Sequence, residues 1–324
     1  MRRFPLPQYI QLYPLSRCNQ NCGFCFNPPS GAPDMHLSDA MRLLDIMQDN
    51  GISELDIMGG EPFLLPWMGS YLPAALKRGI RVNISTNGSL PEAAAGLQGA
   101  DPEMINIGIS IEGSCPEKHN AITGSGNFDR ALKCISDLVS YGLDPLVKTV
   151  LNRQTLDDIN NIIVLLRRSG IRRYYLIHMD MFSKAPADMD ISMSYTEFIS
   201  HYDRIASEHG NIAIQKVNAS CFEKGLLPEG IRCAGGVKKL SVMSDGSVFP
   251  CNLLQHFNDQ RLGNIFEQDL ASIWEGSGLG LFRNFVTNRC EKKDCRNHGS
   301  CTGGCPAHAL FHGYDTGGTD IRCR

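Results

Sequence analysis

The sequence has 324 residues, a length that favours two domains over one. Hydrophobic residues make up 42% of the chain and charged residues 20%, so a large core can be buried and the composition argues against disorder. The net charge of −3 removes the bulk electrostatic case for binding nucleic acid or an anionic membrane. No apolar run approaches the roughly 18 residues of a membrane-spanning helix, and no cleavage site follows the N-terminal arginines. The sequence therefore predicts a soluble, cytoplasmic protein.

Short apolar runs alternate with longer amphipathic stretches through about the first 210 residues. The runs predict six strands, at residues 9–15, 54–58, 81–86, 104–111, 144–151 and 172–179. Six segments have helical periodicity, near residues 38–50, 67–78, 91–98, 127–141, 155–168 and 194–209. Ser38 and Thr155 fit helix N-cap positions. Four glycines fit the left-handed position after a helix end: Gly51, Gly79, Gly142 and Gly170.

This alternation predicts an α/β fold, built as a partial (β/α)6 TIM-like barrel with right-handed crossovers. Six strands are too few for a closed eight-stranded barrel, so the barrel is expected to be open. Functional residues in such sheets lie at the carboxyl ends of the strands. After about residue 215 glycine and cysteine become more frequent, and 240–251 reads as a hairpin that turns at Asp245-Gly246. We therefore predict a barrel domain at 1–215 and a small Cys-rich C-terminal domain at 216–324.

Thirteen cysteines are unusual in a chain of this length without an export signal, and clustered thiols in a reducing compartment bind metal or do chemistry. Cys18, Cys22 and Cys25 form a C-x3-C-x2-C motif directly after the first predicted strand. Three thiolates in one loop can converge on a 4Fe-4S cluster and leave one iron without a protein ligand. A zinc site with a distant fourth ligand, or three unrelated thiols, are the alternatives.

Further motifs follow the next three strands: Gly59-Gly60-Glu61-Pro62, Ser85-Thr86-Asn87-Gly88 and Ser110-Ile111-Glu112-Gly113. In this order, together with the cysteine loop, they resemble the radical SAM enzymes through roughly residues 9–210. The resemblance implies that Cys18, Cys22 and Cys25 hold a 4Fe-4S cluster whose fourth iron is chelated by the amino and carboxylate groups of S-adenosylmethionine. It also places Phe24 near the adenine and the 59–62 segment at the methionine ammonium.

The residue types suit these roles. Paired glycines let the backbone approach a ligand closely, and Glu61 supplies an acceptor for a cation. Alternation along the fourth strand puts Asn106, Ser110 and Glu112 on one face, where a ribose is a plausible partner for Ser110. The family more often has Asp at the position of Glu112. The predicted S-adenosylmethionine contacts are Phe24, Gly59, Gly60, Glu61, Pro62, Ser85, Asn87, Ser110 and Glu112.

The sixth strand ends with two further candidate catalytic groups. His178 and Asp180 share a face near its end, although a core histidine is an equally good interpretation. Lys148 lies inside the fifth strand, where a snorkelling side chain is the simpler interpretation. Cys115, just past the fourth strand, is a weak candidate for a redox role, and Cys134 is expected in the core.

The C-terminal cysteines resemble the SPASM extension of certain radical SAM enzymes, in the pattern Cys233-x12-Gly246-x4-Cys251, then Cys290-x4-Cys295-x5-Cys301-x3-Cys305 and Cys323. The usual x2 spacing is x4 here, between Cys290 and Cys295. SPASM domains commonly hold two auxiliary 4Fe-4S clusters, which need eight ligands, and Cys221 makes eight. The family's interleaved pairing implies one cluster on Cys221, Cys233, Cys251 and Cys305, and another on Cys290, Cys295, Cys301 and Cys323. Two zinc sites are the alternative, and Cys221 could instead be a free thiol that delivers a hydrogen atom.

The resemblance implies reductive cleavage of S-adenosylmethionine to a 5′-deoxyadenosyl radical, hydrogen abstraction from a substrate, and oxidation assisted by the auxiliary clusters. SPASM enzymes mostly modify peptides or proteins by crosslinking, epimerisation or side-chain oxidation. The first strand begins near the amino terminus, so a peptide substrate is expected to need a separate leader-recognition protein or direct capture. A flavodoxin- or ferredoxin-type protein is the expected electron donor. The alternatives are a small-molecule enzyme, such as a tetrapyrrole-precursor decarboxylase, and a non-catalytic zinc-stabilised interaction protein.

Overall fold

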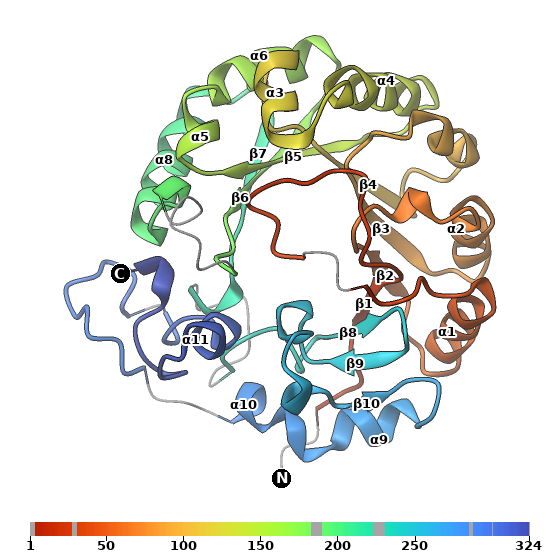
Figure 1. Ribbon diagram of the computed structural model, residues 1–324, viewed down its shortest axis with the longest axis vertical. Coiled ribbons are helices and arrows are strands. Elements are labelled where there is room, and N and C mark those ends of the chain that lie inside the picture. The colour runs from red at the N-terminus through yellow and green to blue at the C-terminus, as the bar shows by residue number, and fades with distance from the viewer. Residues whose placement is uncertain are drawn as a thin grey trace.

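The computed structural model describes residues 4–27, 31–182, 190–222, 231–284, 288–299 and 301–323. One curved sheet of ten strands forms an incomplete ring around a central space, in the order β10-β9-β8-β1-β2-β3-β4-β5-β6-β7 (Figure 1). All pairs from β8 through β1 to β7 are parallel, whereas β9 and β10 run antiparallel to their neighbours. The strands are β1 (Tyr9–Tyr13), β2 (Glu54–Ile57), β3 (Arg81–Thr86), β4 (Ile105–Ser110), β5 (Leu146–Leu151), β6 (Arg173–His178), β7 (Ala213–Val217), β8 (Lys239–Met243), β9 (Ser247–Phe249) and β10 (Gly263–Asn264).

Helices cover the outer face of this ring (Figure 1). They are α1 (Leu37–Asp49), α2 (Met68–Lys77), α3 (Pro116–Thr123), α4 (Asn127–Ser140), α5 (Arg153–Leu156), α6 (Ile159–Arg168), α8 (Tyr195–Glu208) and α9 (Leu270–Glu275). Two more helices, α10 (Gly280–Arg283) and α11 (Pro306–His312), lie in the C-terminal segment at the opening of the ring (Figure 1). The helix predicted near 91–98 is a 3₁₀ helix, Pro91–Leu97. Within the described residues, no helix has the length and apolar character needed to cross a bilayer.

The predicted open α/β barrel is confirmed, and it contains more strands than predicted. All six predicted strands are present, and β7 and β8 extend the parallel sheet at its two sides. β8 lies in the predicted C-terminal domain, yet it pairs with β1 in register from Tyr9↔Lys239 to Tyr13↔Met243. The hairpin turn is also confirmed, since Gly246 has a φ of 80° between β8 and β9. The division at residue 215 stays a prediction.

The helix ends follow the glycine predictions but not the N-cap predictions. Gly51, Gly79, Gly142 and Gly170 have φ values of 69°, 74°, 79° and 76°, as left-handed helix ends require. Ser38 lies inside α1, whose N-cap is His36. Thr155 is the third residue of α5, and its hydroxyl accepts from the backbone N–H of the true cap, Asn152. Thr155 therefore supplies the second half of a capping box rather than the cap itself.

The inner face of the ring is polar, and the outer face is apolar. Strand residues with outward side chains, such as Leu12, Ile57 and Val82, are buried against the helices. On the inner face Asn83 Nδ2 donates to Asp56 Oδ1 at 2.7 Å, and Lys239 Nζ donates to Gln11 Oε1 at 2.7 Å. Buried polar groups are costly unless they are paired or meet a ligand, so this lining points to a site inside the ring.

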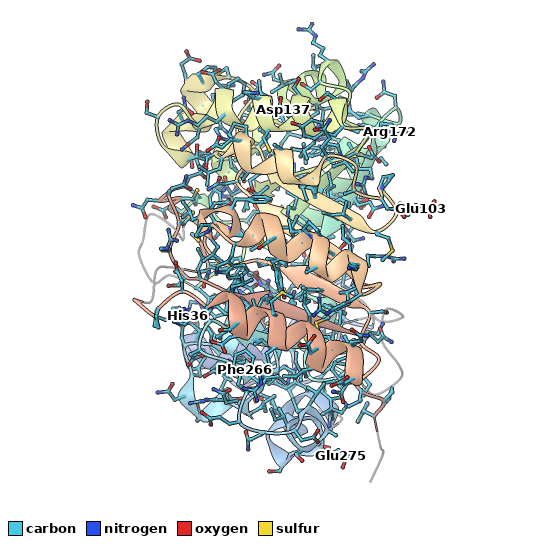
Figure 2. The ribbon with its side chains drawn as sticks, turned by 90° about the vertical axis from the view of Figure 1, so that its right-hand side faces the viewer. His36, Glu103, Asp137, Arg172, Phe266 and Glu275 are labelled. Carbon is cyan, nitrogen blue, oxygen red and sulfur yellow. The ribbon has the colours of Figure 1, made fainter. Side chains whose placement is uncertain are left out.

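The carboxyl ends of the parallel strands, β8 and β1 to β7, share one rim of the ring. In the side view of Figure 2, Glu103 and Arg172, which precede β4 and β6, lie at the right-hand rim. His36, which caps α1 after the loop that follows β1, lies at the opposite rim. Figure 1 shows the chain between β1 and α1 passing across the ring, and this loop carries Cys18, Cys22 and Cys25.

Candidate active site

The three cysteines of the loop after β1 lie close to one another. Burial, together with the neighbouring charges of Glu112, Cys25 and Cys18, raises the pKa of Cys22 to about 12. The N–H of Cys25 donates to the carbonyl of Cys22 at 3.0 Å, which folds the segment between them into a tight turn. Phe24, in that turn, is half-buried. The loop therefore presents three free thiols from one short segment.

The turn after β2 supports this loop through its backbone. The N–H of Gly60 donates to the carbonyl of Leu15 at 3.2 Å, and the N–H of Glu61 donates to that of Arg17 at 3.1 Å. A Cβ at Gly60 would lie 1.8 Å from the carbonyl oxygen of Arg17, and one at Gly59 would lie 2.6 Å from that of Leu15. The start of the cysteine loop fills the space that a Cβ at either glycine would need. The approach of these glycines to a ligand stays a prediction.

Replacing Gly60 by Ala should dislodge the cysteine loop. The added Cβ meets backbone atoms that cannot rotate away, so we expect a loss of about 1–3 kcal/mol in the free energy of unfolding, with less iron retained after reconstitution. Chemical denaturation and iron analysis measure both effects. Gly69→Ala is the matched control, because a Cβ there meets no atom within 4 Å. Equal stability of the two variants would show that close packing at Gly60 does not hold the cysteine loop in place.

Glu61 connects the turn after β2 to the turn after β3. Its Oε1 accepts from the N–H of Phe63 at 3.0 Å and from the hydroxyl of Thr86 at 2.8 Å, and its Oε2 accepts from the N–H of Asn87 at 2.7 Å. Asn87 Nδ2 in turn lies 3.7 Å from the sulfur of Cys18. Glu61 is fully buried, and all three of these donors belong to the chain itself. The contact of its carboxylate with a cation stays a prediction.

Lys148 points into the ring rather than snorkelling to its edge. Its Nζ donates to Ser85 Oγ at 2.5 Å, and its side chain lies over Gly108, where an added Cβ would come within 2.4 Å of Lys148 Cε. Burial lowers the pKa of this amine to about 8, while the carboxylates of Asp56 and Glu61 act to raise it. Ser110 lies on the next strand beside Lys148 in register. The inner face thus offers one amine and two hydroxyls to a ligand.

Glu112 lies just beyond β4 and is buried. Its Oε2 accepts from the N–H of Val150 at 3.0 Å, and its own N–H donates to Nδ1 of His119 at 3.0 Å. Burial raises the pKa of Glu112 to about 8. The hydrogen bond from Val150 and the charge of Lys148 act to lower this pKa but do not cancel the effect of burial. The protonated carboxyl is therefore favoured in the folded chain.

This raised pKa predicts a pH dependence of stability. The protonated carboxyl of Glu112 contributes to the free energy of unfolding. This contribution has its full value below the unfolded pKa of 4.5 and is lost as the pH rises through about 8. Glu112→Gln keeps a neutral acceptor for Val150, so the wild-type free energy of unfolding should fall relative to that of the variant by up to about 1.4 kcal/mol per pH unit. Denaturation of both cluster-free proteins between about pH 5 and pH 8 measures the difference. A constant difference would show that Glu112 is ionised when folded.

The other predicted catalytic groups lie away from the inner face. His178 stacks on Phe198 of α8 at 4.7 Å, its Nε2 donates to the carbonyl of Met193 at 3.1 Å, and burial lowers its pKa to about 3. His178 is therefore a core histidine, which was the alternative interpretation of the sequence. Asp180 pairs with Arg322 at 3.0 Å. Cys115 is the half-buried N-cap of α3, and Cys134 is buried in the core, as predicted.

The C-terminal cysteines form two groups. In the first, the thiols of Cys221 and Cys305 hydrogen-bond to each other, and the charges of Cys233 and Cys305 both act on Cys251, whose pKa burial raises to about 12. The second group lines a cavity of about 630 Å³ and consists of Cys290, Cys295, Cys301 and Cys323. These two groups have the same members as the pairing that the resemblance implies, and the assignment of each set to one cluster stays a prediction.

These donor sets fit iron–sulfur clusters. All thirteen cysteines are free thiols, and thiolates in groups of three or four are the ligands that such clusters take. In the part of the chain that the structure describes, no three His, Cys, Asp or Glu side chains converge closely enough to hold a single metal ion. A cluster does not require that convergence, because each of its irons takes its own thiolate.

Sequence reasoning missed three groups around these thiols. Burial raises the pKa of Tyr13, on the inner face of β1, and the charges of Cys251 and Cys25 act in the same direction. The buried guanidinium groups of Arg232 and Arg322 lie beside the first C-terminal group, where Arg232 donates to the carbonyls of Gly303 and Gly304. Charged and aromatic residues at these positions carry no local pattern that separates them from surface residues.

Two family models match this chain: the Radical SAM superfamily over residues 12–177 and the SPASM iron-sulfur cluster-binding domain over residues 233–306. A PqqA peptide cyclase of Rhizobium meliloti is 25% identical over 98% of this chain and 87% of its own. An AdoMet-dependent heme synthase of Methanosarcina barkeri is 25% identical over 84% of this chain and 83% of its own. The crystal structure of Streptococcus suis SuiB bound to precursor peptide SuiA superposes with a TM-score of 0.80, at 20% identity, over 99% of this chain and 76% of SuiB.

Proposed function

Because this chain belongs to the radical SAM superfamily and carries a SPASM iron–sulfur cluster-binding domain, we propose that it is an enzyme that modifies a peptide or protein by radical chemistry. When bound, a reduced 4Fe-4S cluster with S-adenosylmethionine at its open iron supplies a 5′-deoxyadenosyl radical that takes a hydrogen atom from unactivated carbon. Cys18, Cys22 and Cys25 would hold that cluster. The chain's own part is to place the loop, bind the nucleotide and exclude water.

The residues at the carboxyl rim divide this work. The backbone of Gly59 and Gly60 and the carboxylate of Glu61 fix the position of the cysteine loop. Lys148 carries an ammonium suited to the carboxylate of S-adenosylmethionine, and the hydroxyls of Ser85 and Ser110 suit its ribose. Four further residues at this rim are proposed as contacts on the motif resemblance: Phe24, Pro62, Asn87 and Glu112.

One observation carries the proposal of an oxidative modification. Gln255, four residues after Cys251, donates its Nε2 to Asn27 Oδ1 at 2.9 Å, and the carbonyl of Asn27 lies 3.6 Å from the sulfur of Cys25. This contact supports a short distance between the radical site and the first auxiliary group. A substrate between them could lose a hydrogen atom to one site and an electron to the other. Cys221 is fully buried and hydrogen-bonded to Cys305, which favours a ligand over a hydrogen-atom donor.

Peptide substrates are supported by the relatives. The similar proteins include a PqqA peptide cyclase, and the SuiB structure contains a precursor peptide. We propose that a separate leader-recognition protein delivers the substrate and that a flavodoxin- or ferredoxin-type protein supplies the electron. A tetrapyrrole-precursor decarboxylase is the second candidate, because an AdoMet-dependent heme synthase is equally similar, at 25% identity.

Anaerobic reconstitution followed by turnover assays tests the proposal. Three full clusters correspond to about twelve irons per chain, and a zinc-stabilised protein would be colourless with none. S-adenosylmethionine should perturb the paramagnetic spectrum of the reduced protein, and 5′-deoxyadenosine should form faster with a precursor peptide than with a carboxylate-rich tetrapyrrole. Faster cleavage with the tetrapyrrole would favour the second candidate. An unperturbed spectrum would contradict both.

A further inference from the structure

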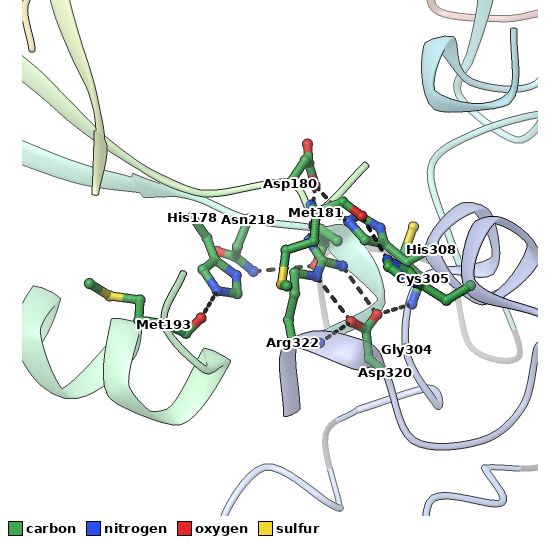
Figure 3. Close-up of polar contacts among 12 residues, drawn as sticks. His178, Asp180, Met181, Met193, Asn218, Gly304, Cys305, His308, Asp320 and Arg322 are labelled. Atoms are coloured by element: carbon green, nitrogen blue, oxygen red, sulfur yellow. Dashed lines mark hydrogen bonds and ion pairs between the residues drawn. The ribbon is translucent and has the colours of Figure 1, made fainter. Parts of the chain in front are cut away.

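A buried charged network joins the end of β6 to the C-terminal segment (Figure 3). Arg322 Nε donates to Asp320 Oδ1 at 3.0 Å, and Arg322 Nη1 donates to Asp180 Oδ1 at 3.0 Å. The guanidinium also stacks on the ring of Phe222, with its Cζ 4.8 Å from the centroid. The side chains of Arg322 and Asp320 are each 1% exposed, so water hardly screens their charges. We call Asp180, His308, Asp320 and Arg322 the Arg322 network.

This network surrounds one cysteine of the first auxiliary group. Asp320 Oδ2 accepts from the backbone N–H of Cys305 at 2.7 Å. His308 lies one turn after Cys305, at the start of α11, and is fully buried. Arg322 Nη2 donates to the same Asp320 Oδ2 at 3.2 Å, so one carboxylate oxygen joins the buried guanidinium to the backbone of Cys305. None of these residues belongs to the motifs that assign the clusters.

The hydrogen bonds of His308 determine where its proton lies. The backbone N–H of Met181 donates to Nε2 of His308 at 3.0 Å, so Nε2 is an acceptor and the ring proton sits on Nδ1. Among the described residues Nδ1 has no hydrogen-bond partner, although it is buried. A buried N–H donor without a partner costs free energy, and the sulfur of Cys305, at the N-cap of the same helix, is the neighbouring group able to accept it.

Donors and cations near a cluster's sulfurs favour its reduced form, which carries one more negative charge. We propose that the Arg322 network sets the reduction potential of the auxiliary cluster held by Cys305, with His308 Nδ1 donating to the Cys305 sulfur and Arg322 supplying buried positive charge. Asp180 opposes Arg322 from the end of β6. The inference rests on the proposed function for the cluster itself and goes beyond it in assigning the groups that tune it.

Two variants with opposite expected effects on the reduction potential test the Arg322 network. His308→Gln keeps an acceptor for Met181 but removes the donor on the Cys305 side, so the potential should fall. At a fixed applied potential the ratio of reduced to oxidised cluster should drop by about threefold to tenfold, where tenfold corresponds to 59 mV for one electron. Asp180→Asn removes a negative charge and should raise the potential. A variant that merely loosened the fold would not shift the two in opposite directions.

The measurement is an electron paramagnetic resonance redox titration of the full-length chain. Replacing Cys18, Cys22 and Cys25 by Ala in every protein removes the signal of the radical-site cluster. His308→Asn is one matched control, because its amide can keep a donor at the Nδ1 position. His312→Gln is another, since His312 contacts the carbonyl of Met181 from the same helix at 2.9 Å. Both controls should keep the parent potential.

The possible results distinguish a failure of the cluster assignment from a failure of the tuning role of the Arg322 network. If the titrated chain shows no auxiliary cluster signal, the cluster assignment in the proposed function fails, and with it this inference. If the signals are present but His308→Gln and Asp180→Asn leave the potentials unchanged, or move them in the same direction, the proposed function stands and the network has no tuning role. Opposite shifts with unchanged controls establish it.

Discussion

Replacing Cys22 by Ser should abolish the cleavage of S-adenosylmethionine while leaving the C-terminal clusters in place. Cys22 lies between Cys18 and Cys25 in a loop that offers one thiol for each of three irons, and its neighbours cannot supply the missing ligand. Iron should fall from about twelve to about eight per chain, because one cluster of three is lost. We expect 5′-deoxyadenosine formation to drop by at least about a thousandfold, since the cofactor supplies the bond-breaking chemistry.

Cys134→Ala is the matched control for this prediction. It also removes one thiol, but from the core of α4, where Cys134 is buried between the helix and the sheet. That variant should keep full iron and full cleavage, apart from a modest loss of stability. Iron analysis and product chromatography on the two proteins give the comparison. Retained cleavage in Cys22→Ser would mean that the radical site lies elsewhere in the chain.

The strands and the cysteine motifs could be predicted because their signals are local. Alternating apolar runs marked β1 to β6, and left-handed glycines marked the helix ends. The pairing of β8 with β1 was missed because it joins segments more than 220 residues apart, as the contact from Lys239 to Gln11 shows. β7 was missed because none of its residues is buried, so its apolar pattern is weak.

The site was predictable in its residue types but not in their roles. Gly60 and Glu61 were recognised from their motif. Only the fold shows that Gly60 packs against the backbone of the cysteine loop and that Glu61 accepts hydrogen bonds from the turn after β3. The sequence allowed His178 to be either a catalytic group or a core residue. Its side chain packs on Phe198 of α8, outside the sheet, so it is a core residue. Arg322 resembles an exposed basic residue near a chain end, whereas it is among the most buried side chains of the protein. Burial of this kind depends on contacts that no local pattern records.

Glu61→Ala should have the second-largest effect, because one carboxylate satisfies three donors. The substitution leaves the N–H groups of Phe63 and Asn87 and the hydroxyl of Thr86 without their acceptor in a buried turn. Each unsatisfied group costs roughly 1–3 kcal/mol, so the free energy of unfolding should fall by several kcal/mol. Asn87 would also lose its anchor, and its side chain contacts the sulfur of Cys18.

The two substitutions at Glu61 distinguish positioning from ligand binding. Glu61→Gln keeps one carbonyl oxygen for Thr86 and Phe63 and disturbs only the bond from Asn87, so it should retain most of the stability and iron that Glu61→Ala loses. Denaturation and iron analysis measure these effects, and titration with S-adenosylmethionine measures nucleotide affinity in the iron-loaded protein. If Glu61 instead binds the nucleotide's ammonium directly, Glu61→Gln would keep its iron yet lose affinity about as strongly as Glu61→Ala. Because both carboxylate oxygens already accept from the chain in a fully buried position, we expect affinity to follow iron content in both variants.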